Sequence, residues 1–306
     1  MGVIPTILLL PVSYYLSGFW DDFLSSGIIL STPFLALVIF YAHFSVQYVK
    51  KRLIGLADYA DSIRQDGSVT DLRRLYLFRW VAVTYLMLIG TVQTIFTFLV
   101  LPPRYSLMQK LGISIPFFFW NIFVCTFFWV WGYSMYRIYR LGKLPLTLKP
   151  FTEDRTLGLK PFGRASLQLT TVYVGFLASV FVTTVPLAAY SLPVIALEMG
   201  LLFIGIVIFF LPLFTLHAKL VDAKQEANHW ISPQYSALVQ KLRKEGIENS
   251  DEKLYHELTA IDKIQRDINQ IHNWPFDVGI VTRLAAIVFS VVAILLASFV
   301  RAILRF

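Results

Sequence analysis

Long apolar runs fill most of the chain, and polar residues are concentrated between them. An α-helix needs about 20 consecutive, mostly apolar residues to cross a bilayer. The runs lack the alternation of apolar and polar residues that is typical of barrel strands. The pattern therefore predicts an all-α, polytopic membrane protein with seven transmembrane helices, at residues 3–19, 28–49, 78–101, 113–139, 167–190, 192–217 and 276–300.

The first run, at residues 3–19, differs from the other six because it is short and contains Pro5 and Pro11. Proline lacks a backbone N–H donor and tends to interrupt a helix. A re-entrant or interfacial segment is therefore the alternative to a span here. The run has neither a basic leader nor a small-residue cleavage motif, so we expect it to be retained rather than removed as a signal peptide.

Basic residues between the runs predict the orientation of the chain. The connections at 50–77 and 140–166 are rich in lysine and arginine, and the charged segment after the sixth run lies on the same side. Loops of this kind face the cytoplasm. We expect an integral protein of the plasma membrane with its N-terminus inside and its C-terminus outside, although Arg301 and Arg305 then lie on the disfavoured side.

The same pattern divides the chain into three parts. The first contains transmembrane helices one to six with the two cytoplasmic loops, the second is a cytoplasmic helical anchor and the third is the final transmembrane helix; they cover residues 1–217, 218–274 and 275–306. The sixth span is expected to continue into the cytoplasm, with helix breaks at 231–233 and 246–250. Trp274 and Pro275 predict a hinge before the final span, because proline stops a helix from simply continuing.

An apolar stripe marks the last cytoplasmic helix, which is expected over residues 253–271. Its members recur every three or four residues, so they lie on one helix face and must pack against something. We take them as candidates for an oligomer interface: Leu254, Leu258, Ile261, Ile264, Ile268 and Ile271.

Composition narrows the function classes. Hydrophobic residues make up 57% of the chain and charged residues 15%, and the net charge is +8. The basic residues flank the spans, so anionic lipid is the expected partner and no nucleic-acid binding is predicted. Catalytic and nucleotide-binding motifs are missing from the sequence, and the histidines lack metal-ligand spacing, so we expect neither an enzyme nor a cofactor. Cys125 is the only cysteine and forms no intrachain disulfide.

Two features of the spans suggest a site. Glu198 lies near the outer end of the sixth span and is a candidate for a ligand pocket. The alternative is a carboxylate near the lipid headgroups that is exposed or hydrogen-bonded to a neighbouring helix. One face of the last span carries mostly small residues between arginines, and it either packs closely on another helix, the commoner outcome, or borders a narrow water path. The pore candidates on this face are Arg283, Ala286, Ser290, Ile294 and Ala297.

This plan resembles the seven-transmembrane ion channels that include insect odorant and gustatory receptors, with distant gustatory-receptor-like members in microbes. The shared features are the two termini on opposite sides, a tight outer turn before the sixth span, a prolonged sixth span, and a seventh split into halves, here 253–271 and 276–300. The insect family's Thr-Tyr and Gln-Phe signature has no counterpart in the last span. Pore and ligand residues are therefore not carried over by motif.

The resemblance implies a homotetrameric, ligand-gated ion channel. In that family the cytoplasmic parts join the subunits, the last span lines the pore, and an outward-facing pocket binds a small molecule. Two other classes are alternatives for this chain. A secondary transporter would have internal repeats and broken helices at mid-membrane; a non-enzymatic signalling or scaffold protein would recruit a partner through the cytoplasmic stripe.

Overall fold

The computed structural model describes residues 3–18, 20–25, 28–63, 80–100, 105–144, 146–184, 192–245, 252–275 and 278–304. The regular elements of these residues are helices, which confirms the all-α prediction. They are α1 (Val3–Leu16), α2 (Trp20–Ser25), α3 (Ile28–Ser62), α4 (Trp80–Val100), α5 (Leu107–Gly142), α6 (Lys160–Thr184), α7 (Leu192–Glu245), α8 (Glu252–Asn269) and α9 (Val278–Leu304).

Three helices among the described residues are long and apolar enough to cross a membrane: Thr32–Ser62, Leu107–Gly142 and Met199–Lys244. The prediction of a helical membrane protein is therefore confirmed. The other four predicted spans overlap α1, α4, α6 and α9. Seven crossings, and the placement of the two termini on opposite sides, stay predictions.

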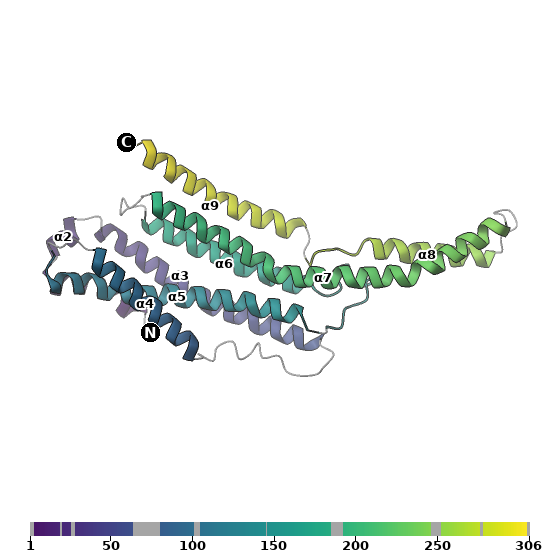
Figure 1. Cartoon of the computed structure of the whole chain (residues 1–306), viewed down its shortest axis with the longest axis horizontal. Helices are drawn as coiled ribbons and strands as arrows, with labels where there is room; N and C mark the ends of the chain where they lie inside the picture. The colour runs from purple at the N-terminus through teal and green to yellow at the C-terminus, as the bar shows by residue number, and fades with distance from the viewer. Residues whose placement is uncertain are drawn as a thin grey trace.

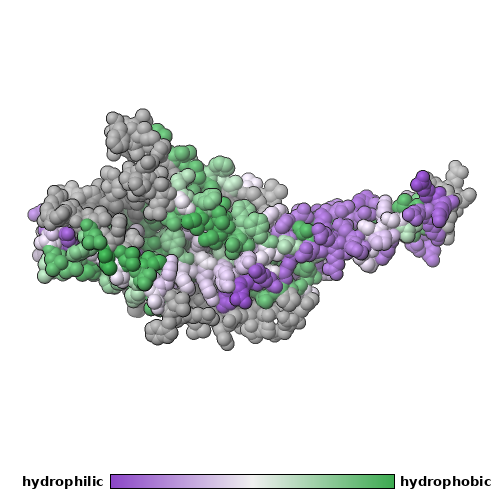
Figure 2. Space-filling model, in the orientation of Figure 1, coloured by the Kyte–Doolittle hydropathy of each residue, from purple (hydrophilic) through white to green (hydrophobic). Residues whose placement is uncertain are grey.

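The helices form a bundle with an arm (Figure 1). Helices α3, α5, α6 and α7 pack along one another, α4 and α1 pack on α5, and α9 lies against α6 and α7. Helix α7 extends beyond the bundle, and α8 packs antiparallel against this extension. The two helices together form a hairpin arm. On the face drawn in Figure 2, the described surface of the bundle is mostly hydrophobic away from the arm and becomes polar toward it, and the arm surface is mostly hydrophilic.

Aromatic rings fill the centre of the bundle. The Tyr173 ring stacks on Trp131 with centroids 4.0 Å apart, and Phe127 stacks on Phe176 at 4.1 Å. Tyr173 is fully buried, and its hydroxyl donates a hydrogen bond of 2.7 Å to the Leu201 carbonyl oxygen. The hydroxyl needs that partner because an unpaired polar group is costly away from water. These contacts join α5, α6 and α7.

The structure corrects one expected helix break. Helix α7 runs through Pro233 as one element of 54 residues, about 80 Å long, so the predicted break at 231–233 is wrong. Proline releases the carbonyl of the residue four positions earlier, which is His229. His229 is exposed on the arm, so water can hydrate that carbonyl and the helix continues. The expected break at 246–250 lies outside the described residues.

One helix end lies further along the chain than expected, and one proline does not interrupt its helix. Helix α3 extends to Ser62, so the first part of the predicted 50–77 connection is helical. The reason is a buried face, because Leu53, Leu56, Ala57 and Ala60 recur at helical spacing and are almost completely buried. Near the N-terminus, α1 is continuous through Pro11.

Candidate functional site

The predicted hinge between α8 and α9 is packed against α7. The Trp274 ring stacks on His217 at 4.3 Å with an interplanar angle of 20°, and it lies 5.9 Å from the Phe214 ring. His217 Nδ1 is 2.5 Å from the Asn273 carbonyl oxygen. A carbonyl only accepts, so Nδ1 carries the proton. Pro275 is buried. The break in the chain is thus held by α7 rather than left free.

The end of α8 is fixed by a lysine that sequence reasoning did not single out. Lys224, on α7, donates through Nζ to the carbonyl oxygens of Asn269 at 3.0 Å and Ile271 at 3.2 Å. A helix leaves its last carbonyls without intrahelical donors, and a cation suits that end of the helix dipole. His272 N–H then donates to the Arg155 carbonyl oxygen at 3.0 Å. The linker is therefore bound both to α7 and to the loop before α6.

The apolar stripe of α8 packs within its own chain. Leu254, Ile268 and Ile271 are at most 3% exposed. Ile261 and Ile264 are half-buried against the apolar cluster that contains Ile268 and Ile231 of α7, and Leu258 is also half-buried. The stripe therefore does not need a second subunit to be covered. Their role as an oligomer interface stays a prediction, since periodicity shows that a face is buried but not what else contacts it.

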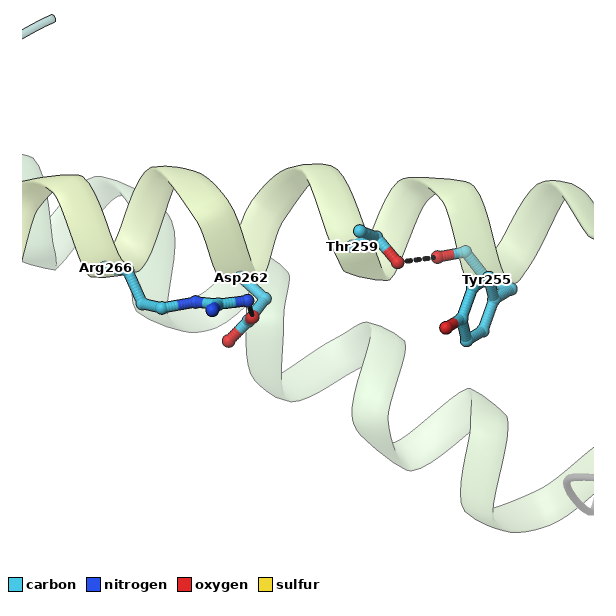
Figure 3. Close-up of polar contacts among 4 residues, drawn as sticks. All are labelled: Tyr255, Thr259, Asp262 and Arg266. Carbon is cyan, nitrogen blue, oxygen red and sulfur yellow. Dashed lines mark hydrogen bonds and ion pairs between the residues drawn. The ribbon is translucent and has the colours of Figure 1, made fainter.

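The outer face of α8 is polar. Arg266 and Asp262 form an ion pair one turn apart, and Thr259 Oγ1 donates to the Tyr255 carbonyl oxygen at 2.8 Å (Figure 3). The Tyr255 side chain is 63% exposed. Surface pairs of this kind contribute little to stability, because water screens them.

Among the described side chains of α9, the buried and half-buried ones share one side of the helix. Val291 is 4% exposed and Ile287, Val288 and Val292 are half-buried, all in the cluster that α6 and α7 share. The pore candidates Arg283, Ala286 and Ser290 are exposed on the opposite side, as are Ala293 and Phe289. Ser290 Oγ donates to the Ala286 carbonyl oxygen at 2.8 Å. The side chains of Ile294 and Ala297 lie outside the described part of the structure.

Glu198 lies in α7 close to its start. Its side chain is outside the described part of the structure, so its role in a ligand pocket stays a prediction.

The loop before α6 contains a tight acidic turn. Asp154 accepts hydrogen bonds from the Thr156 N–H at 2.9 Å, the Thr156 hydroxyl at 2.8 Å and the Gly158 N–H at 3.0 Å. Burial raises the pKa of Asp154, but these bonds and the nearby Lys160 charge outweigh burial and hold that pKa below its ordinary value. The Asp-x-Thr-x-Gly spacing is a readable turn signal that the sequence analysis did not use.

We expect Asp154→Ala to destabilise this loop by about 1–3 kcal/mol, because two buried N–H groups lose their acceptor. The adjacent Glu153→Ala is the control, since Glu153 is exposed. A lowered folded-state pKa means that the contribution is present above the ordinary aspartate pKa and is lost as pH falls through the folded-state value. Thermal unfolding from neutral to acidic pH should show the mutant converging on the wild type in acid. A constant gap at all pH values would contradict this.

Comparison of the whole chain with protein-family models, with curated proteins and with solved structures found no match. The function is therefore argued from the geometry of this chain.

Proposed function

We propose that the protein is an oligomeric ion channel in which α9 borders the ion path and the α7–α8 arm controls it. The observation that carries this proposal is the exposed face of α9. It presents Ala286, Ser290 and Ala293 in consecutive turns, with Arg283 at the end nearer the arm. Contact with lipid does not call for small side chains. Close packing against a second copy of the chain, or a narrow aqueous path, does require them.

The linker at the start of α9 supplies a route for gating. Only two residues separate the buried Pro275 from the first residue of α9, Val278. Trp274 stacks on His217, and Lys224 holds the end of α8. A shift of the arm therefore pulls on α9 directly. This arrangement accords with the split last span of the seven-transmembrane channels that the sequence resembles.

A second copy of the chain is the expected cover for the α9 face. Four copies around an axis would place the small residues toward that axis and the larger exposed Phe289 toward a neighbour or lipid. Arginine at a pore mouth attracts anions and opposes cations. We therefore expect anion preference if Arg283 is unpaired in the assembly, and a small molecule bound near Glu198 is the expected activator.

The first test images the full-length protein in lipid nanodiscs. The proposal expects four subunits with α9 at the axis and contacts between arms through the outer face of α8. A monomer, or an oligomer in which α9 lies away from the symmetry axis, would overturn the proposal. Either result would favour a transporter or a scaffold protein instead.

Conductance in planar bilayers then tests the path. Ser290→Trp should abolish the current while the assembly stays intact, because the indole fills the space beside the axis. Phe203→Trp is the matched control, since Phe203 is 66% exposed on α7, and it should leave the current unchanged. Unaltered current in both variants would show that α9 does not line the ion path.

A further inference from the structure

Basic side chains from distant parts of the chain converge on one pocket beside α3 and α6. The pocket has a volume of about 720 Å³. Five of its lining residues are basic and one, Asp154, is acidic. The basic residues are Lys51 and Arg52 from α3, Lys149 from the loop, and Lys160 and Arg164 from α6. Like charges are costly to gather, so a concave site lined this way favours an anion.

The loop side of the pocket is built by hydrogen bonds. The Tyr59 hydroxyl, from α3, donates to the Gly158 carbonyl oxygen at 2.7 Å. Gly158 has φ +84°, and a Cβ there would lie 3.2 Å from both Lys149 Cγ and the Tyr59 hydroxyl oxygen. The backbone angle favours glycine, and a Cβ there would make a tight contact with both side chains. Lys149 N–H also donates to the Leu157 carbonyl oxygen at 3.1 Å, so its position is fixed by the loop.

The acidic residue of the pocket is already engaged. Asp154 accepts bonds from Thr156 and Gly158 within its own turn, and its charge interacts with Lys160. Asp154 therefore offsets part of the charge of Lys160, and the pocket keeps an excess of positive charge. On the α3 side, Arg52 lies over the Tyr48 ring at 5.2 Å and donates through Nε to the Tyr48 hydroxyl at 3.2 Å, which orients the guanidinium.

The start of α6 adds to the attraction. Helix α6 begins at Lys160, and its first turn contains no acidic residue. A helix N-terminus carries a partial positive charge that favours anions. Leu56, Pro161 and Ala165 supply an apolar part of the lining. The basic side chains suit a phosphate, and the apolar part of the lining suits a less polar group attached to it. A phosphate ester therefore fits this pocket better than a small inorganic ion does.

We propose that this pocket binds a phosphate-bearing anion, the chemical class shared by anionic lipid headgroups and free phosphate esters. Guanidinium groups bind phosphate through two parallel hydrogen bonds, and lysines add point charge. The site does not depend on ion conduction. It is distinct from the α9 face and from the arm, so its test can fail or succeed independently of the channel.

Binding is measured on the purified full-length protein in a neutral detergent. The three probes are dioctanoyl phosphatidylglycerol, the zwitterionic dioctanoyl phosphatidylcholine, and glycerol 3-phosphate. The test variant is Arg52→Gln with Arg164→Gln, and Arg52→Lys with Arg164→Lys is the rescue. Arg243→Gln with Lys244→Gln is the control, because both residues are exposed at the tip of the arm, far from the pocket (Figure 1).

We expect wild type and control to bind phosphatidylglycerol in preference to phosphatidylcholine, with affinity that falls as salt rises. The double glutamine variant should bind about 10- to 30-fold more weakly, and the lysine variant should recover much of the loss. Comparable binding of glycerol 3-phosphate would identify a free phosphate ester as the source, and preference for the lipid would identify the headgroup. Equal affinities in the glutamine variant and the control, or no binding of any probe by wild type, would overturn the proposal.

Discussion

Gly205→Leu is expected to lower the thermal midpoint of the protein by roughly 6–12 °C, which corresponds to about 3 kcal/mol of overpacking. A Cβ at Gly205 would lie 2.7 Å from Tyr173 Cδ1, well inside van der Waals contact. Tyr173 cannot move away, because it is stacked on Trp131 and bonded to the Leu201 carbonyl oxygen. Helices α6 and α7 would have to separate in order to admit the larger side chain.

Gly200→Leu is the matched control on the same helix. Gly200 is exposed, and a Cβ added there would meet nothing within 4 Å. Leucine also has the higher helix propensity, so the midpoint should stay the same or rise slightly. The measurement is the fraction of monodisperse protein that survives heating in detergent. Equal loss in both variants would show that the approach of Tyr173 to α7 does not limit packing.

Ile268→Asp is expected to release α8 from α7. Ile268 is 0% exposed, so an aspartate there would place a charge inside an apolar cluster. A buried unpaired charge costs about 3–5 kcal/mol. The hairpin arm carries this cost alone, so α8 should detach while the bundle stays folded. Limited trypsin digestion should then cleave rapidly after Lys263 and Arg266.

Thr259→Asp tests whether this effect comes from burial. Thr259 is exposed on the outer face of the same helix, and threonine and aspartate have similar helix propensity. We expect digestion of this variant to match wild type. The prediction fails if the two aspartate variants are cleaved at the same rate. In bilayers, the Ile268 variant should also lose control of the current if the arm gates α9.

The sequence was most informative where a single helix face determines the structure. The stripe from Leu254 to Ile271 repeats every three or four residues, which predicted one buried face of α8. The covering surface is α7 of the same chain, and no local pattern specifies that choice. In the same way, Pro275 predicted a break before the last helix, but the stacking of Trp274 on His217 joins residues 57 positions apart (274 − 217).

The basic pocket could not be predicted from the sequence, for a different reason. Arg52 and Arg164 are both visible in the sequence as flanks of apolar runs, and there they served to predict orientation. Their convergence depends on the packing of α3 along α6, which brings together residues separated by more than a hundred positions. The helix break predicted at Pro233 was wrong for a related reason. Whether a proline stops a helix depends on hydration of the released carbonyl, and hydration is set by tertiary exposure.

The order of synthesis gives the hairpin arm a further consequence. Helix α7 leaves the ribosome before α8, so the side of α7 on which α8 packs, which includes the fully buried Ile231, remains uncovered until α8 has been made. A nascent chain interrupted between the two helices would leave this apolar face of α7 uncovered. Faces of that kind are what chaperones and proteases bind. Completion of the arm therefore distinguishes a finished copy from a truncated one, and incomplete copies are open to removal.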